Sequence, residues 1–263
     1  MTEAKGLFTD GAAYDQLARR FTRPAGEVFL DWLALPANLD WIDVGCGTGA
    51  FTQLVLDRCA PKRVSAIDPS AEQIAYARTT AAAKRVDFQA GDAQALPFGN
   101  AAFDAGTMAL VISFVPDPDK AVAELKRVTR PGGTIGAYMW DFLNKGSPRQ
   151  HLGDAVKRVG VAVQQLPGYA HSRMEAMEGF FKSAGLADIA TRIIELEVAY
   201  DNFDEYWTQQ TALASGAAAN IRSMSAPDVE RLKADLRANL PKDKTGRITY
   251  RVKANAVKGR ILG

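Results

Sequence analysis

The chain has 263 residues, of which 47% are hydrophobic, and its 32 basic and 30 acidic side chains give a formal net charge of +2. This length allows one large domain or two small ones with a substantial core. The near balance of charge excludes the strong positive field that draws proteins to nucleic acid or to anionic membranes. A small-molecule partner is therefore expected.

Targeting signals and cysteine usage favour a cytoplasmic location. The start "MTEAKGLFTD" lacks a basic segment followed by an apolar one, and no uncharged apolar run approaches the ~20 residues that span a bilayer. Cys46 and Cys59 have no metal-type spacing and make a poor disulfide framework. We expect reduced thiols, no membrane insertion and a monomer or homodimer.

Residues 9–34 predict two helices ahead of the first strand. Tyr14, Leu17 and Phe21 recur at helical spacing, a break is expected at Pro24, and a second helix runs toward Leu33.

Strand-like runs then alternate with helical patterns as far as residue 140. Their continuous apolar character is typical of parallel strands covered on both faces, and they occupy residues 39–44, 63–68, 86–90, 103–112 and 133–140. The helix after the fourth run has Asp117 as its N-cap, Pro118 at its first position, and Pro131-Gly132-Gly133 as its stop. This alternation predicts a doubly wound α/β sheet.

The pattern changes after residue 140. Residues 174–186 predict a helix ended by Gly185, residues 188–200 a strand, and residues 247–257 a final strand that alternates in period two and is expected to be antiparallel.

The whole chain, 1–263, is interpreted as one domain. Its parts are N-terminal helices (1–38), the ligand-binding core (39–140), helix-prone insertions that cap the strand ends (141–172 and 203–239), and the remaining sheet elements (173–202 and 240–263).

The stretch "WIDVGCGTGAF" places Gly45, Gly47 and Gly49 directly after the first strand. In an open α/β sheet this turn forms the floor of the ligand crevice, and glycine lets the backbone turn tightly and approach a ligand. The loop alone does not identify the ligand. It also fits the dinucleotide fingerprint with Ala50 in the third place, so an NAD(P)-dependent oxidoreductase stays possible, as does a turn that binds nothing.

Two acidic residues extend this crevice. Asp68 ends the second strand, where a carboxylate can bind both hydroxyls of a ribose or cap the helix that starts near Ser70. Asp92 and Ala93 follow the third strand in "GDAQALPF", where they can recognise the amine and ring nitrogen of adenine or form a local Asx turn.

Four motifs in order identify a family. "IDVGCGTG", "AIDPS", "AGDAQALPF" and "FDAGTMALVISFVPDPDKAVAELKRVTRPGG" resemble the class I S-adenosylmethionine-dependent methyltransferases of the ubiquinone/menaquinone-biosynthesis-like (type 11) subgroup, closely over residues 38–140. A looser similarity continues through "FFKSAGLADI" and "FDEYW". The resemblance implies a Rossmann-like seven-stranded sheet whose last strand is antiparallel and inserted, with S-adenosylmethionine as cofactor and S-adenosylhomocysteine as product.

The resemblance also implies roles for individual residues. The three glycines would line the methionine moiety, Asp68 would hold the ribose, and Asp92 with Ala93 would bind adenine. The backbone at Ala109 and Leu110 would lie beneath the methionine carboxylate and sulfonium, and Asp43 would assist the amino group. Tyr14 would close over the cofactor or pack in the core. The complete predicted cofactor set is Tyr14, Asp43, Gly45, Cys46, Gly47, Thr48, Gly49, Asp68, Pro69, Asp92, Ala93, Ala109 and Leu110.

The implied reaction is an in-line SN2 transfer of a methyl group to a small organic molecule. A general base is needed only if the acceptor must lose a proton. His151 and His171 could serve, or could be surface or packed imidazoles, and no catalytic residue is assigned. Trp140, Asp141 and Phe142 follow the fifth strand, where they would face the acceptor or pack beneath the cap.

Several partners are not expected. "ALVISF" lacks the Asn/Asp-Pro-Pro-aromatic loop of amino-group methylation, and no Pro-Cys pair offers a pyrimidine nucleophile, so nucleic acid is disfavoured. Asp117 is explained as a helix cap, and we predict no metal. A protein that binds the adenosyl ligand without catalysis is the third alternative.

Overall fold

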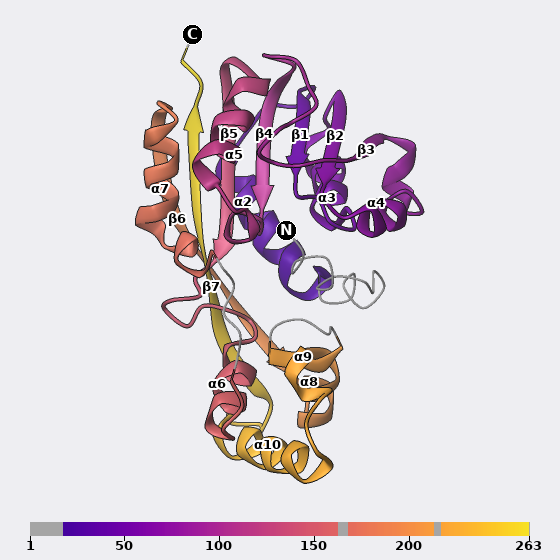
Figure 1. The fold of residues 1–263 in the computed structure, drawn as a ribbon, viewed down its shortest axis with the longest axis vertical. Coiled ribbons are helices and arrows are strands. Elements are labelled where there is room, and N and C mark those ends of the chain that lie inside the picture. The colour runs from indigo at the N-terminus through magenta and orange to yellow at the C-terminus, as the bar shows by residue number, and fades with distance from the viewer. Residues whose placement is uncertain (1–17, 163–167, 213–216, 263) are drawn as a thin grey trace.

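The computed structural model describes residues 18–162, 168–212 and 217–262, and a seven-stranded sheet forms its centre (Figure 1). The strand order is β3-β2-β1-β4-β5-β7-β6. The strands are β1 (Asp40–Val44), β2 (Arg63–Asp68), β3 (Val86–Ala90), β4 (Phe103–Ala109), β5 (Thr129–Trp140), β6 (Ala187–Tyr200) and β7 (Ile248–Arg260). β1 to β5 pair in parallel, and β7 lies antiparallel between β5 and β6. The predicted sheet, with its last strand inserted, is confirmed.

Helices cover both faces of the sheet. One face carries the π-helical turn η2 (Ala18–Thr22), α2 (Arg23–Leu33), α3 (Ala50–Cys59) and α4 (Ala71–Ala77), and the 3-10 turn η3 (Ala81–Lys84) follows α4. The other face carries α5 (Pro118–Val128) and α7 (Met174–Ser183), with the 3-10 turns η4 (Ile112–Phe114) and η5 (Tyr169–Ser172) nearby. Within the described ranges, no helix combines the length and the apolar character needed to cross a bilayer.

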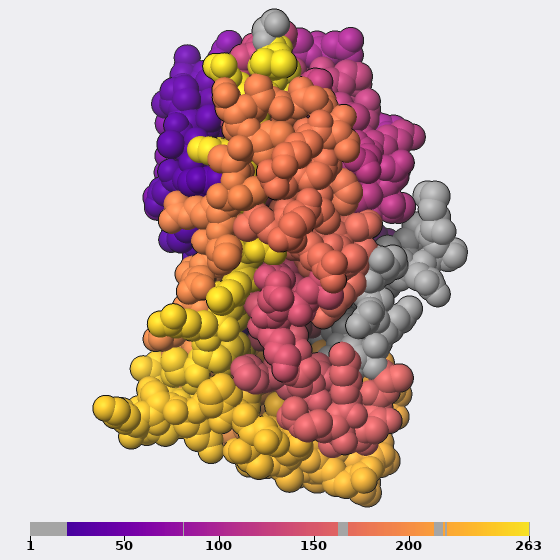
Figure 2. Space-filling model, turned by 90° about the vertical axis from the view of Figure 1, so that its left-hand side faces the viewer, coloured from indigo at the N-terminus to yellow at the C-terminus, as the bar shows by residue number. Residues whose placement is uncertain are grey.

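The remaining helices surround an extension of the sheet. β6 and β7 continue below the other strands, and α6 (Gln150–Arg158), α8 (Phe203–Thr211), α9 (Ala217–Ile221) and α10 (Ala226–Asn239) gather there (Figure 1). We call these four helices, with the lower ends of β6 and β7, the helical lobe. Seen from the side, α7 and β6 cover the core while α6 and α10 lie below them (Figure 2). The buried residues of the lobe belong to the same apolar cluster as α2 and α3.

The helix start predicted at Asp117 is confirmed, but the predicted stop is wrong. The Asp117 carboxylate accepts a hydrogen bond from the Lys120 N–H at 3.0 Å, and Pro118 is the first helical residue. The helix ends at Val128, and Pro131 to Gly133 lie within β5. The pairing of β4 with β5 shifts there, from Phe103 opposite Thr129 to Ala105 opposite Thr134. Such an irregularity accommodates a proline that cannot donate to the ladder.

Two further boundaries differ from prediction. β4 ends at Ala109 rather than residue 112, because Leu110 has a positive φ of 62° that breaks the strand. Pro24 interrupts nothing, since η2 runs directly into α2 and places this proline in the first turn, where a missing N–H costs least. Tyr14 lies outside the described residues.

The α2 helix packs against α3, the helix that follows the first strand and its loop. The ring of Phe29 is fully buried, 4.8 Å from the Tyr138 ring and 6.1 Å from that of Phe51, the second residue of α3. A Cβ at Gly26 would come within 2.7 Å of the Leu54 side chain. The backbone of α2 therefore packs directly against a side chain of α3.

Replacing this ring tests the packing. We expect Phe29→Ala to lower the free energy of unfolding by about 3–5 kcal/mol, because it leaves a cavity beside the rings of Tyr138 and Phe51. Urea denaturation measures the change, with Ile193→Ala as control, since Ile193 is 54% exposed on the edge strand. A loss no larger than that of the control would contradict the proposed packing role.

Candidate active site

The glycine loop is a tight turn fixed to the end of β2. The N–H groups of Gly45 and Cys46 both donate to the Ile67 carbonyl, at 2.7 and 3.0 Å, and the Gly49 N–H donates to the Cys46 carbonyl at 2.9 Å. Gly45, Gly47 and Gly49 have φ values of 77°, 54° and 85°, which side chains of L-residues rarely adopt. The loop therefore requires glycine for its conformation.

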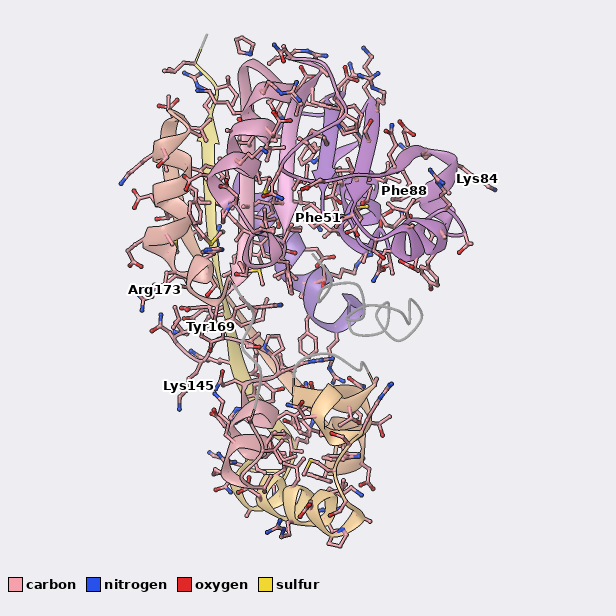
Figure 3. The ribbon with its side chains drawn as sticks, viewed as in Figure 1. Phe51, Lys84, Phe88, Lys145, Tyr169 and Arg173 are labelled. Atoms are coloured by element: carbon pink, nitrogen blue, oxygen red, sulfur yellow. The ribbon has the colours of Figure 1, made fainter. Side chains whose placement is uncertain are left out.

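Close contacts impose a second requirement on Gly45 and Gly49. A Cβ at Gly45 would lie 2.4 Å from a methyl carbon of Val111, and one at Gly49 would lie 3.0 Å from the Phe88 ring. The loop is thus pressed between the segment after β4 and a ring from β3. Figure 3 shows Phe51 and Phe88 in the core, above the lobe.

Asp68 connects the glycine loop to the next helix. One carboxylate oxygen accepts the Gly47 N–H at 2.9 Å and the other accepts the Ser70 N–H at 2.9 Å. The N-cap of α4 is Ser70, whose hydroxyl accepts from the Gln73 N–H, so the alternative in which Asp68 caps this helix is wrong. Burial raises the pKa of Asp68, and the two backbone hydrogen bonds oppose that rise. Each oxygen keeps a lone pair for a ligand.

Asp43 and Thr48 carry buried oxygens beside the loop. Asp43 is 1% exposed, and its Oδ2 accepts the Thr52 hydroxyl at 2.6 Å. Its Oδ1 and the Thr48 hydroxyl have no hydrogen-bond partner anywhere in the described structure. Buried polar atoms are rarely left in this state. A ligand amino or hydroxyl group above the loop would satisfy both.

Asp92 and Ala93 lie at the end of β3. Asp92 is exposed, and its Oδ1 accepts the Gln94 N–H at 2.8 Å, so the Asx turn that the sequence allowed is present. Ala93 is buried against the sheet. A Cβ at Gly91 would fall 2.3 Å from Ile67, so the turn packs directly on β2 and keeps Asp92 on the same edge as Asp68.

Leu110 turns the chain toward the glycine loop. Ala109 pairs with Tyr138, and the Leu110 N–H donates to the Tyr138 carbonyl at 2.8 Å. Its positive φ costs conformational energy in a residue with a γ-branched side chain, and such strain gathers at functional sites. The next residue, Val111, is the one that packs on Gly45.

Of the three residues expected on the acceptor side, one packs in the core and two lie near the junction with the lobe. Trp140 is buried in the core, and Asp141 accepts hydrogen bonds from the side chain of Asn144. Phe142 stacks on Tyr169 at 5.4 Å, and the Tyr169 hydroxyl donates to the Phe142 carbonyl at 2.6 Å. Figure 3 shows Tyr169 at the level where core and lobe meet.

The two histidines lie in different environments. His151 lies in the lobe with its ring 4.7 Å from that of Tyr250, and burial lowers its pKa. His171 packs edge-on against Phe180 in α7. Neither contacts the glycine loop through any of these interactions.

Sequence reasoning missed Thr52 and Val111. Thr52 lies in the first turn of α3, and only the folded turn between β1 and α3 brings its hydroxyl to Asp43. Val111 carried no signal, because its contact with Gly45 depends on the backbone of Leu110.

Two surface hollows in the described part of the chain lie away from the glycine loop. Among residues 18–162, 168–212 and 217–262, no three His, Cys, Asp or Glu side chains are placed to hold a metal ion. One surface hollow of about 250 Å³ lies on the lobe beside Phe203 and Arg237. Another, of about 540 Å³, lies between the ends of α2 and α3 beside Asp31 and Arg58. Neither hollow is lined by the glycine loop.

The methyltransferase domain family matches residues 42–137 of this chain. A malonyl-[acyl-carrier protein] O-methyltransferase from Serratia marcescens is 36% identical over 152 residues, which are 58% of this chain and 56% of that protein. The chain spans about half the length of the curated relatives it matches.

Solved structures share the fold. A putative methyltransferase of an antibiotic biosynthesis pathway from Anabaena variabilis has a TM-score of 0.63 at 15% identity and covers 90% of this chain and 96% of its own. Phosphoethanolamine N-methyltransferase 2 of Haemonchus contortus, in complex with S-adenosyl-L-methionine, has a TM-score of 0.57 at 16% identity and covers 95% of this chain and 56% of its own.

The steric requirement at the glycine loop can be measured. We expect Gly45→Ala to lower the free energy of unfolding by about 2–5 kcal/mol, because it combines a positive φ with a clash against Val111. Gly99→Ala is the matched control, since its Cβ would meet nothing within 4 Å. Equal unfolding midpoints in urea for the two variants would refute the steric requirement for glycine at position 45.

The buried carboxyl of Asp43 predicts a pH dependence. Burial raises its pKa from 3.8 to about 7. Below pH 4 the carboxyl is protonated in both states and costs nothing. Between pH 4 and 7 the unfolded chain ionises while the folded site holds its proton, so stability is lost as pH rises.

Asp43→Asn removes this loss. The free energy of unfolding of the variant minus that of the wild type should therefore rise by up to about 4 kcal/mol between pH 4 and pH 8. Denaturation across this range measures it, and a difference that does not change with pH would contradict the raised pKa.

Proposed function

We propose, from its membership of the class I S-adenosylmethionine-dependent methyltransferases of type 11, that this chain transfers a methyl group from S-adenosylmethionine to a small organic acceptor. The observation that carries the proposal is the pair of unpartnered buried oxygens, on Asp43 and Thr48, beside the glycine loop. The activity and its substrate are proposals because the relatives match over about half of their length.

The residues at the edge of the sheet fit the cofactor. In this proposal, the glycine loop lies against the methionine moiety, with Cys46 and Thr48 as its intervening residues, and Asp43 Oδ1 receives the amino group, directly or through water. Asp68, beside Pro69, accepts the ribose hydroxyls with the lone pairs left free by Gly47 and Ser70. The exposed Asp92 and the backbone of Ala93 contact adenine, and the backbone at Ala109 and Leu110 closes the methionine end.

The chemistry asks little of the protein beyond position. When bound, S-adenosylmethionine supplies an electrophilic methyl group on a positively charged sulfur, which an acceptor atom displaces in line. The chain must hold that acceptor at the carboxyl edge of β4 and β5 and keep water away. The helical lobe lies below this edge (Figure 1), and we propose that it acts as a cap within a single domain.

The small organic acceptor is proposed from the near balance of charge, a formal net charge of +2, which gives no strong field for a polyanionic partner. The Serratia relative is named for an acyl-carrier-linked malonyl group. We include a malonyl thioester among the acceptors to be tested and do not assign it to this chain. The free thiols of Cys46 and Cys59 support a reducing compartment, for which we propose the cytoplasm.

The alternatives are not favoured. A nicotinamide oxidoreductase would use the same type of glycine loop, but the family match and the inserted antiparallel β7 belong to methyltransferases. A binding protein without catalysis would keep the same cofactor site, so only turnover distinguishes it.

Calorimetric titration tests the cofactor. We expect S-adenosylmethionine and S-adenosylhomocysteine to bind and NADPH to fail. Asp68→Ala should weaken binding about 10- to 100-fold, through lost charge-assisted hydrogen bonds, and Asp92→Ala should weaken it less. Asp87→Ala is the control, because Asp87 is an exposed residue within β3. Binding of NADPH alone would overturn the proposal. Formation of S-adenosylhomocysteine with an acceptor panel then separates an enzyme from a binding protein.

A further inference from the structure

The inner face of α8 places two polar side chains in the interior of the lobe. Tyr206 and Gln210 are four residues apart and therefore lie on the same face of this helix. Both are fully buried, and they are the two residues of α8 that are buried in this way. Polar side chains at such positions need hydrogen-bond partners.

Part of this cluster is satisfied. The Gln210 Nε2 donates to the hydroxyl oxygens of Tyr200 and Tyr250, at 2.7 and 3.4 Å. The Tyr250 hydroxyl donates to the Pro148 carbonyl at 2.9 Å. Strands β6 and β7 supply these two tyrosines, so the cluster joins α8 to the extended part of the sheet.

Two atoms of the cluster are not satisfied. The Tyr206 hydroxyl and the Gln210 Oε1 have no hydrogen-bond partner in the parts of the chain that the structure describes. Burial raises the pKa of Tyr206, so its hydroxyl keeps its proton and is available as a donor. Gln210 Oε1 can only accept. The cluster thus lacks one group that can both accept and donate.

The surroundings are aromatic. The Tyr206 ring meets that of Tyr200 edge-on at 5.1 Å, and Tyr200 and Tyr250 are stacked at 6.2 Å. Arg20 lies 4.1 Å above the Tyr200 ring, and its charge is paired with Glu205 at 2.8 Å. Arg149 is the other cation that acts on this cluster, where it opposes the rise in the pKa of Tyr206.

The cluster lies beyond the carboxyl ends of the parallel strands, on the extension formed by β6 and β7. Ala254 in β7 pairs with Trp140, the last residue of β5. Tyr250 lies four residues before Ala254, toward the start of β7. At 3.3 Å per residue this places it about 13 Å beyond the carboxyl ends of the parallel strands. A molecule that reached from the methyl-transfer position to this cluster would be elongated.

We propose that Tyr206 Oη and Gln210 Oε1 bind a neutral hydroxyl group of an elongated aromatic or apolar methyl acceptor, remote from its methylated atom. This inference rests on the proposed function. The ligand hydroxyl accepts from Tyr206 and donates to Gln210, while the tyrosine rings contact its apolar body. A carboxylate fits less well, because it cannot donate to Gln210 Oε1 and would leave that oxygen unpaired.

The stability of the protein without any ligand gives a first test. If the acceptor alone completes the cluster, Tyr206→Phe removes a buried hydroxyl that has no partner and should raise the thermal midpoint by roughly 2–4 °C. Tyr200→Phe is the matched control. It removes a hydroxyl that accepts from Gln210 at 2.7 Å and should lower the midpoint. A fall in both variants would overturn the proposal, because it would show that a permanent partner already satisfies Tyr206.

Binding of defined probes gives the second test. Protein saturated with S-adenosylhomocysteine is titrated with 4-phenylphenol and with 4-phenylbenzoate. We expect the neutral phenol to bind at least tenfold more tightly than the carboxylate, and Tyr206→Phe to weaken the phenol about two- to tenfold. The affinity of S-adenosylhomocysteine should be the same in both proteins.

The outcomes separate the two proposals. Failure of S-adenosylhomocysteine to bind would defeat the proposed function itself. Normal binding of S-adenosylhomocysteine with no binding of the phenol, tighter binding of the carboxylate, or equal phenol affinity in wild type and variant would defeat only the assignment of Tyr206 and Gln210.

Discussion

The carbonyl oxygen of Ile67 fixes the position of the glycine loop, because the N–H groups of both Gly45 and Cys46 converge on it. The next residue, Asp68, then holds the Gly47 N–H with one oxygen and the Ser70 N–H with the other. The end of β2 therefore organises two loops at once. With the loop fixed, α2 can pack behind α3, and Val111 can close against Gly45. An anionic side chain and a set of backbone dipoles are preorganised in this way before any ligand arrives.

The sheet also supports the helical lobe without a separate apolar core. β6 and β7 run past the carboxyl ends of the parallel strands, and the lobe helices pack on this extension (Figure 1). The apolar cluster consequently continues from α2 and α3 into the lobe. Arg20 reinforces the connection, since it joins η2 to Glu205 at the start of α8.

The sequence was sufficient to predict the alternation of strands and helices and a sheet covered on both faces, and the reasons are local. The inserted antiparallel last strand was implied by the family resemblance. The runs at 63–68 and 86–90 are bounded by charge or glycine and became β2 and β3 unchanged. The predictions failed where residues distant in the sequence determine the local conformation. Pro131 joined a strand because β4 offered a shifted pairing, and no property of leucine indicated the left-handed backbone of Leu110. The pattern "FDEYWTQQ" indicated a helix, but burial of Tyr206 and Gln210 depends on how far β6 and β7 extend, which no single segment encodes.

The place of β7 in the sheet has a consequence for biosynthesis. β7 pairs with both β5 and β6, and β6 has no other neighbour in the sheet. During translation, residues 40–140 can assemble five parallel strands on the ribosome, whereas the 14 residues of β6 emerge with nothing to pair with. They wait until the ribosome has released residues 248–260, and such an unpaired strand is a target for chaperones. The helices of α8 to α10 are synthesised during that interval, so the lobe and the sheet reach their final arrangement in the same late step.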